Sequence, residues 1–210
     1  MRDYPPKPVH IYNRAVFLDR DGTINVDTHY PYDASLLEII PRSLDGIKIL
    51  SRLPVHIIVV SNQAGIALGI FTRKDMSNFN KELRSRVERA SGRIDAFYYC
   101  PHLEPKNLTK GQMPCNCSKP APGLLLEAAR DFNIDLSKSF IIGDKTSDIV
   151  AGEVVGCTGI LVKTGKGGKE EGALPIKTNI IVDDLYEASL VVQSLIEHEE
   201  LEKVHAVVGS

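Results

Sequence analysis

Residues 17–25, FLDRDGTIN, are the stretch of sequence that indicates the fold most directly. The apolar run 14–18 ends abruptly at Asp19, as does a strand buried on both faces of a parallel sheet. Asp21 follows two residues later, and Gly22 permits a sharp turn that points both carboxylates into one pocket. An Asp-x-Asp pair by itself is more often a turn than a catalytic pair. Placed after a buried strand, one carboxylate can attack phosphorus and the other can act as general acid and base.

Outward from this segment, strand-like and helix-like stretches alternate along the chain. The alternation predicts a doubly wound parallel sheet with helices on both faces, in one α/β domain spanning residues 1–210. A polar arm, residues 1–13, precedes the first strand. We expect strands at 14–18, 55–60, 96–99, 139–142, 159–162 and 180–182, and helices at 41–53, 72–90, 122–132, 145–155 and 183–202.

Two helix starts carry specific signals. Pro41 suits the first turn of its helix, because its missing N–H group needs no partner there. Thr72 is a good N-cap, and Asp75 three residues later predicts a capping box. The Gly-rich stretch 164–172, TGKGGKEEG, is expected to form a flexible surface loop.

Polar residues follow three of the expected strands. Ligands of such folds bind beyond the carboxyl ends of the strands. Asp144 opens the string DKTSD, whose carboxylates suit Mg²⁺. Ser61 offers donors to phosphate oxygens, and Lys119 offers a positive charge that offsets developing negative charge. The four pieces together favour a phosphoryl-transfer site.

A cluster of three cysteines and one histidine lies between Ser61 and Lys119 in the sequence. Three thiolates and one imidazole are the ligands of a closed tetrahedral zinc site. In a chain whose start, residues 1–6, is polar and does not resemble a secretory signal, a metal site is favoured over disulfides and over a catalytic thiol. The expected zinc ligands, in a loop spanning residues 100–117, are Cys100, His102, Cys115 and Cys117.

Composition excludes several classes of protein. The 210 residues are 43% hydrophobic and 25% charged, with a net charge of −2, the balance of an ordinary globular protein. No apolar run approaches the length of a membrane span, and no basic excess favours nucleic acid. We therefore expect a cytoplasmic monomer that acts on a small molecule.

The motifs together resemble the haloacid dehalogenase (HAD) superfamily of phosphohydrolases. Within it, the stretches FLDRDGTIN, SNQAGIALG, YYCPH with CNCSKPAPG, and IIGDK are similar to the heptose 1,7-bisphosphate phosphatases. The resemblance implies a HAD fold without a cap domain and removal of the 7-phosphate of D-glycero-D-manno-heptose 1,7-bisphosphate through an aspartyl-phosphate. That reaction belongs to nucleotide-heptose biosynthesis for lipopolysaccharide.

The resemblance also implies a role for each matching residue. Asp19 would be the nucleophile and Asp21 the general acid and base. Asp19, the Asp21 carbonyl and Asp144 would hold Mg²⁺, while a zinc ion would stabilise the loop. Substrate-binding roles carry over to Asp27, His29, Tyr30, Ser61, Asn62, Gln63, Ser118, Lys119 and Lys145.

One residue departs from the family pattern and bears on the substrate. The family has Arg immediately before the lysine, whereas this chain has Ser118, which cannot supply that charge. Histidinol-phosphate phosphatase, or another phosphatase of small sugar phosphates, is the alternative activity. A third hypothesis is a phospho-acceptor domain without turnover. Such a domain needs no second general acid and base, the role for which Asp21 is placed.

Overall fold

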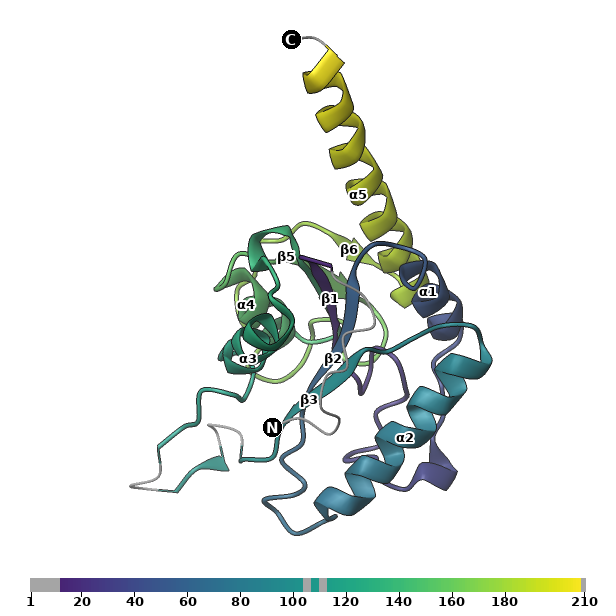
Figure 1. Cartoon of the computed structure of the whole chain (residues 1–210). Coiled ribbons are helices and arrows are strands. Elements are labelled where there is room, and N and C mark those ends of the chain that lie inside the picture. Colours follow the sequence, from purple (N-terminus) through teal and green to yellow (C-terminus); the bar gives the residue numbers. More distant parts are fainter. Residues whose placement is uncertain (1–11, 104–106, 110–112, 209–210) are drawn as a thin grey trace.

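The centre of the protein is a six-stranded parallel β-sheet (Figure 1). The structure is a computed structural model that describes residues 12–103, 107–109 and 113–208. Its strands are neighbours in the order β3-β2-β1-β4-β5-β6, and every pairing is parallel. Their bounds are β1 Ala15–Leu18, β2 His56–Asn62, β3 Ala96–Cys100, β4 Phe140–Gly143, β5 Thr158–Val162 and β6 Ile181–Val182. The expected doubly wound sheet is confirmed.

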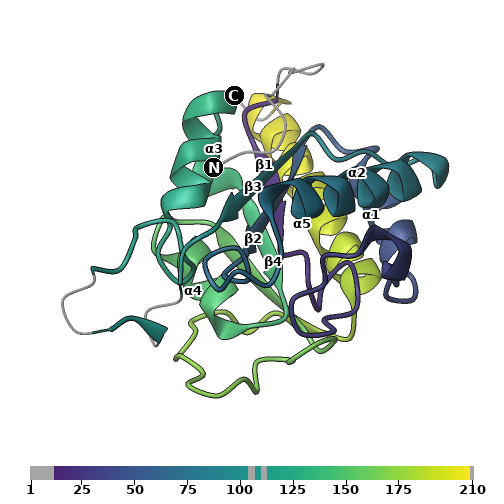
Figure 2. The ribbon, with the colours of Figure 1, turned by 90° about the horizontal axis from the view of Figure 1, so that it is seen from below.

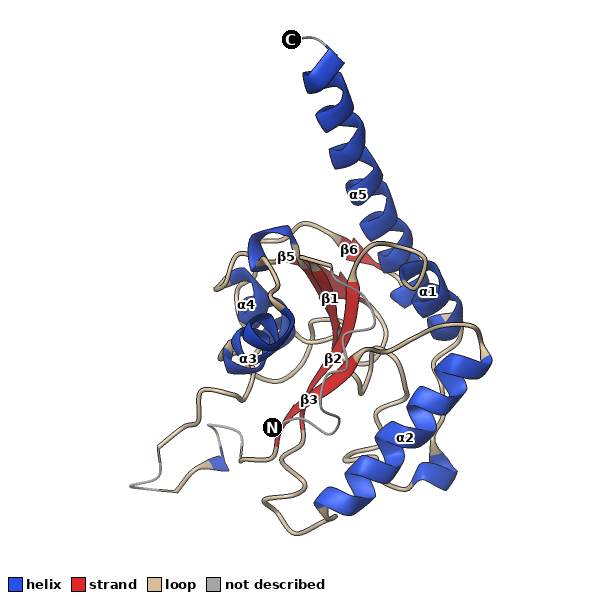
Figure 3. Cartoon of the chain, viewed as in Figure 1, coloured by secondary structure: helices blue, strands red, loops and turns tan. Residues whose placement is uncertain are grey.

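Helices cover both faces of this sheet (Figure 3). On one face lie α1 (Ser43–Leu50), α2 (Arg73–Arg89) and α5 (Leu185–Val208), and on the other lie α3 (Gly123–Phe132) and α4 (Thr146–Glu153). The view from below separates the same two layers (Figure 2). Alternate residues of β1 enter the two cores: Val16 and Leu18 pack on the first face, and Phe17 on the second. Burial on both sides explains why these strands are apolar without interruption.

The helix starts differ in how well the sequence predicts them. The Thr72 capping box is confirmed, since its side chain and that of Asp75 each accept from the other's backbone N–H. The first-turn role of Pro41 is wrong, because α1 begins only at Ser43. Arg42 precedes it in the left-handed region, with φ of 66°, so the helix cannot extend back to Pro41.

Other differences lie at the ends of the elements. β2 and β3 run one or two residues beyond the expected limits, to Asn62 and Cys100, and therefore carry site residues inside the sheet. α5 runs to Val208 and extends away from the sheet (Figure 1). Two short 3-10 turns, η1 (Ala34–Leu36) and η3 (Leu136–Lys138), were not expected.

The insertions between the site motifs are small. Between β1 and β2 the chain forms η1 and α1, so no cap domain is inserted there. None of the described helices is long and apolar enough to span a membrane. Most of the expected N-terminal arm, up to residue 11, lies outside the described residues.

Candidate active site

The site residues gather at the carboxyl edge of the sheet, beyond β1, β2 and β4. Asp19 directly follows β1, and its backbone N–H donates to the Ile142 carbonyl at 2.9 Å, which extends the pairing with β4 by one residue. Asp144 directly follows β4, and Ser61 is near the end of β2. Parallel pairing of neighbouring strands is what brings these three positions, distant in sequence, to one place.

The Lys119 ammonium group lies at the centre of this edge. It is buried and contacts Asp19 Oδ1 and Asp148 Oδ1, each at 2.6 Å, and it donates to the Val60 carbonyl at 2.8 Å. Burial alone would lower the pKa of Lys119, but the charges of Asp148 and Asp19 outweigh it and raise the pKa above its ordinary value. Lys119 therefore stays charged and fixes the Asp19 carboxylate.

Three carboxylates crowd against each other around this lysine. Oxygens of Asp19, Asp144 and Asp148 all lie within 4.8 Å of one another. Burial, followed by the charge of Asp148, raises the pKa of Asp19 to about 6, and burial followed by Asp19 raises that of Asp144 to about 8. Asp144 Oδ1 is buried and has no hydrogen-bond partner within the described residues. Such a group of hard oxygen ligands fits a divalent cation such as Mg²⁺.

Asp21 is held apart from this cluster by its own set of donors. Arg20 donates to both of its oxygens, at 2.8 and 2.9 Å, and Asn25 and Gln63 add bonds of 2.9 and 3.0 Å. Burial would raise the pKa of Asp21, but the charge and hydrogen bonds of Arg20 outweigh it and lower the pKa. In this state the carboxylate is ionised and fixed.

The SNQ string after β2 links the parts of the site. Gln63 donates to the Ser61 hydroxyl at 2.7 Å as well as to Asp21, so it joins β2 to the DRDG turn. Asn62 pairs with the Lys119 backbone in both directions, at 3.0 and 3.1 Å. Both amide side chains therefore orient other site residues, and the phosphate contacts expected of all three remain predictions.

The remaining expected substrate residues are spread more widely. Lys145 lies 3.6 Å from Asp27 Oδ2, while His29 and Tyr30 are exposed at left-handed positions. Burial would lower the pKa of Lys145, but the charges of Asp19 and its neighbours raise it. Ser118 is buried, and its hydroxyl has no partner within the described residues.

Two residues contact the site in ways that the sequence does not predict. Asp148 is one of the DKTSD carboxylates expected to suit Mg²⁺, but its ion pair with Lys119 is not expected; its place in the first turn of α4 is the signal that brings it back beside Asp144. Arg20 has no expected role, although its side chain is almost fully buried against Asp21. Nothing in the sequence distinguishes an inward-pointing arginine from an exposed one at that position.

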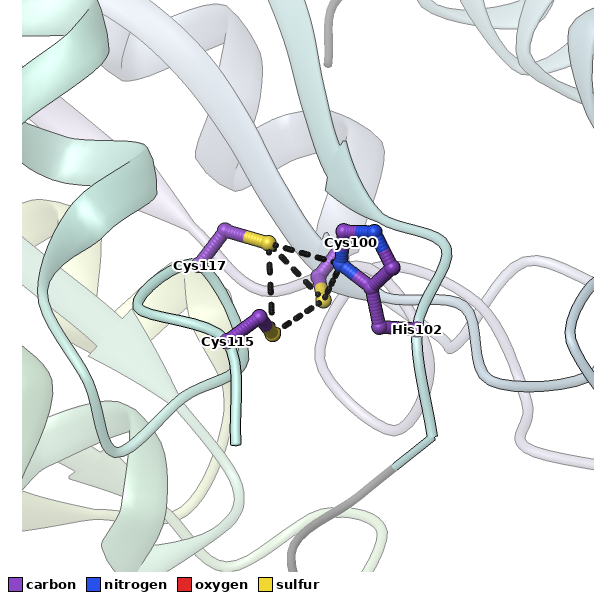
Figure 4. A group of neighbouring side chains, drawn as sticks. All are labelled: Cys100, His102, Cys115 and Cys117. Carbon is purple, nitrogen blue, oxygen red and sulfur yellow. Dashed lines mark hydrogen bonds between the residues drawn. The ribbon is translucent and has the colours of Figure 1, made fainter. Parts of the chain in front are cut away.

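The expected zinc ligands lie together where the start of the long loop after β3, with Cys100 and His102, meets its end, with Cys115 and Cys117 (Figure 4). Their three sulfurs are 3.1, 3.4 and 3.5 Å apart, and His102 Nδ1 lies 3.2 Å from Cys117 Sγ and 3.6 Å from Cys100 Sγ. Ligands of a tetrahedral zinc ion with bonds of ~2.3 Å are about 3.8 Å apart, close to this arrangement. Hydrogen bonds, first with Cys100 and then with Cys115 and His102, lower the pKa of Cys117 to about 5, whereas the bond with Cys117 and burial raise the pKa of Cys100, so Cys117 loses its proton before Cys100 does.

The fourth cysteine, Cys157, is separate from this group. It is buried in the second core, and burial raises the pKa of its thiol to about 12. All four cysteines are free of disulfides. The cluster therefore has four ligands of the kinds that zinc takes, and Cys157 lies outside it.

Comparison with known proteins bears on this geometry. A family model described as HAD-hydrolase-like matches residues 116–188, the part that carries Lys119, Asp144 and Asp148. The D-glycero-β-D-manno-heptose-1,7-bisphosphate 7-phosphatase of Vibrio cholerae serotype O1 is 39% identical over 160 residues, 75% of this chain and 86% of that protein. The protein of the same name from Pasteurella multocida is 32% identical over 185 residues, 87% of this chain and 98% of that one.

A solved structure shows the same likeness. The D,D-heptose 1,7-bisphosphate phosphatase from B. bronchiseptica, complexed with magnesium and phosphate, superimposes with a TM-score of 0.75 and 29% identity. The match covers 88% of this chain and 99% of that one.

Proposed function

Since this chain belongs to the D-glycero-β-D-manno-heptose-1,7-bisphosphate 7-phosphatases of the HAD hydrolases, and is accordingly a phosphoric monoester hydrolase, we propose that it removes the 7-phosphate of that heptose bisphosphate. The observation that carries the proposal is the pairing of one buried lysine with Asp19 and Asp148 beside Asp144. This arrangement supplies a nucleophile in a fixed orientation and a positive charge for the phosphate, both at the carboxyl edge of the sheet.

Asp19 is the nucleophile in this proposal. Its carboxylate oxygen attacks the phosphorus of the 7-phosphate, the bond from phosphorus to the sugar oxygen breaks, and an aspartyl-phosphate forms. Lys119 holds the attacking carboxylate in one orientation and offsets charge on the transferring phosphoryl group. Ser61 and the backbone around it would bind the phosphoryl oxygens.

Asp21 moves the protons. In its protonated form it gives its proton to the leaving sugar oxygen, and it then takes a proton from the water that attacks the aspartyl-phosphate. Arg20 keeps the carboxylate ionised in the free protein, so the proton must be taken up with the substrate. A phosphate dianion close to Asp21 raises its pKa and favours that uptake.

Two metal ions belong to the proposal. The Asp19 and Asp144 carboxylates and the Asp21 carbonyl would hold Mg²⁺, which when bound offsets the negative charge of the phosphate and of the carboxylates. The unpartnered, buried Asp144 Oδ1 supports this assignment. Cys100, His102, Cys115 and Cys117 would hold a structural zinc ion close to Lys119 in sequence.

The proposal extends to the setting of the enzyme. Four free cysteines suit the reducing cytoplasm, where thiols stay available for zinc. We expect a monomer with a small phosphorylated sugar as its partner, and neither nucleic acid nor membrane.

The test is phosphate release in Mg²⁺ from both anomers of heptose 1,7-bisphosphate, from histidinol phosphate and from simple sugar phosphates, compared by kcat/KM. The highest value is expected on one heptose anomer. A highest value on histidinol phosphate would replace the substrate but leave the catalytic residues. A single phosphorylation without turnover would favour a phospho-acceptor domain, and in that case Asp21→Asn would leave phosphorylation intact.

A further inference from the structure

The loop of residues 164–172, expected from its glycines to be a flexible surface loop, lies at the surface and is hydrogen-bonded to the active site. Backbone N–H groups of Lys166 and Gly168 donate to Asp144, one to its carboxylate and one to its carbonyl, each at 2.7 Å. Glu170 accepts from the Thr146 N–H at 2.6 Å. These contacts therefore fix the middle of the loop against Asp144 and the start of α4.

Gly165 shows how closely this loop approaches the catalytic strands. Its φ is 56°, and a Cβ atom there would lie 2.2 Å from Asp144 Oδ2 and 2.7 Å from Gly22 Cα. The loop thus packs against the end of β4 and the DRDG turn together. A side chain on the next residue, Lys166, starts from a backbone that is held beside Asp144.

A pocket of about 390 Å³ opens at this junction. Val26 and Ile40 give it an apolar wall, and Asp27 gives it a carboxylate. The Thr164 hydroxyl is buried and lacks a hydrogen-bond partner within the described part of the chain. Such a mixture of apolar and polar surface fits a sugar, and the lining residues are Gly22, Val26, Asp27, Ile40, Thr164, Gly165 and Lys166.

The cations of the active site and of this pocket differ in whether a carboxylate already matches their charge. Arg20 is paired with Asp21, and Lys119 with Asp19 and Asp148. Lys145 faces Asp27 at 3.6 Å. Lys166 is exposed at the pocket wall and forms no ion pair with any described residue. A substrate that carries a phosphate in addition to the one hydrolysed brings about two further negative charges, which need such a partner.

We propose that Lys166 binds the second phosphate of a doubly phosphorylated sugar and so makes the enzyme prefer a bisphosphate to a monophosphate. This inference rests on the proposed function. Lys166 would contact the phosphate that stays on the product, while the sugar lies along Val26 and Ile40. The fixed backbone of the loop keeps this cation at a constant place relative to Asp144.

The test compares Lys166→Ala with Lys169→Ala. Lys169 is an exposed lysine of the same loop, and its backbone N–H donates to the Lys166 carbonyl, a bond that alanine keeps. Alanine preserves the Lys166 N–H that donates to Asp144. The assay measures kcat/KM on heptose 1,7-bisphosphate and on heptose 7-phosphate, which lacks the second phosphate. We expect K166A to lower the ratio of the two values about tenfold or more, through KM, since hydrogen bonds to charged groups have about that strength. K169A keeps the wild-type ratio.

Each other outcome has a distinct meaning. An equal loss on both substrates in K166A, or no loss on either, overturns the role of Lys166 while the wild-type preference still supports the proposed function. A wild-type enzyme that hydrolyses neither heptose phosphate overturns the proposed function, and the inference with it. A wild-type enzyme that hydrolyses both at equal kcat/KM overturns the inference alone.

Discussion

At the residue scale, Lys119 is a buried charge whose contacts are those that the proposed chemistry needs. Removing an ammonium group from water is costly, and a buried ion pair seldom repays that cost in stability. Here the ammonium group has two carboxylates and one carbonyl within 2.8 Å. A well-packed apolar side chain would stabilise the fold as well, but it would leave Asp19 without orientation and the phosphoryl group without a cation.

Asp19→Asn is expected to reduce turnover by about a thousandfold or more, because an amide cannot form the acyl phosphate. The change is isosteric, and Lys119 keeps Asp148 as a partner, so the variant should fold. Phosphate release measures the loss, and circular dichroism checks the fold. Asp45→Asn, at an exposed position in the first turn of α1, is the control and should retain wild-type rates. Substantial turnover by D19N would remove Asp19 as the nucleophile.

Side chains were harder to predict than positions along the chain. Asp19, Ser61 and Asp144 could be found because each follows an apolar run, and parallel strands must bring such ends together. The role of Asp148 depends on the tilt of α4 toward Lys119, and that of Arg20 on a rotamer that turns inward. The first-turn position of Asp148 is a local signal for its place beside Asp144, whereas the inward rotamer of Arg20 leaves no trace in the sequence pattern.

At the element scale, the cysteine cluster joins the two ends of the loop between β3 and α3. Cys115 and Cys117 lie only four and two residues before Lys119, respectively, and both pack partly against the second core. A loop of this length gains little from packing, so a cross-link through metal would reduce its freedom. The position of Lys119 should therefore depend on the cluster.

Cys115→Ser is expected to lower the bound zinc below one ion per chain and to reduce turnover, while the sheet stays folded. Elemental analysis measures zinc, phosphate release measures activity, and limited proteolysis reports on the loop. Cys157→Ala changes the cysteine outside the cluster and should keep zinc. Wild-type protein purified without zinc would contradict the metal assignment.

The N-terminus of α2 offers a test of element stability at a residue that is not among the site residues. Thr72→Ala removes the side chain that accepts from the Asp75 N–H, and caps of this kind contribute about 1 kcal/mol. We expect Tm to fall by about 2–4 °C with kcat/KM unchanged. Thr72→Ser keeps the hydroxyl and should keep most of the stability. A T72A variant with the wild-type Tm would show that the capping box contributes nothing measurable.

The sequence predicted each strand and each α-helix, because apolar runs and helical spacing are local signals. It failed where distant contacts set the boundary. Arg42, for example, is held by an ion pair of 2.9 Å to Asp184 and by contact with the Tyr186 ring, both next to or in α5. These contacts accompany the left-handed conformation of Arg42, after which α1 begins at Ser43. Their partners are more than 140 residues away, so the sequence near Pro41 cannot predict them.

At the scale of the whole molecule, the carboxyl edge of the sheet gathers three carboxylates whose negative charge the neighbouring side chains do not fully neutralise. The sheet order places β1 and β4 side by side, so Asp19 and Asp144 meet, and α4 adds Asp148. Asp144 retains a buried oxygen without a partner in the described structure. Folding in the absence of a cation must therefore take up protons at this edge.

The stability of the metal-free protein should fall as pH rises from about 4 to about 8. The unfolded pKa of Asp is about 3.9. The folded pKa is raised to about 6 for Asp19 and about 8 for Asp144, so the native state binds more protons across this window. Mg²⁺ competes with those protons, and the Tm increase that it produces should grow between pH 5 and pH 8.

Thermal unfolding across that pH range, in magnesium-free buffer and in excess Mg²⁺, measures both effects. The difference between the two buffers cancels the other titrating groups, among them Asp95, whose pKa burial would raise but hydrogen bonds from His56 and Ile57 lower. Asp144→Asn removes the group with the higher raised pKa and should abolish most of the pH-dependent gain. A gain in Tm that is the same at pH 5 and pH 8 would mean that Mg²⁺ binds away from this edge, because only carboxylates that hold protons in the free protein make its binding depend on pH.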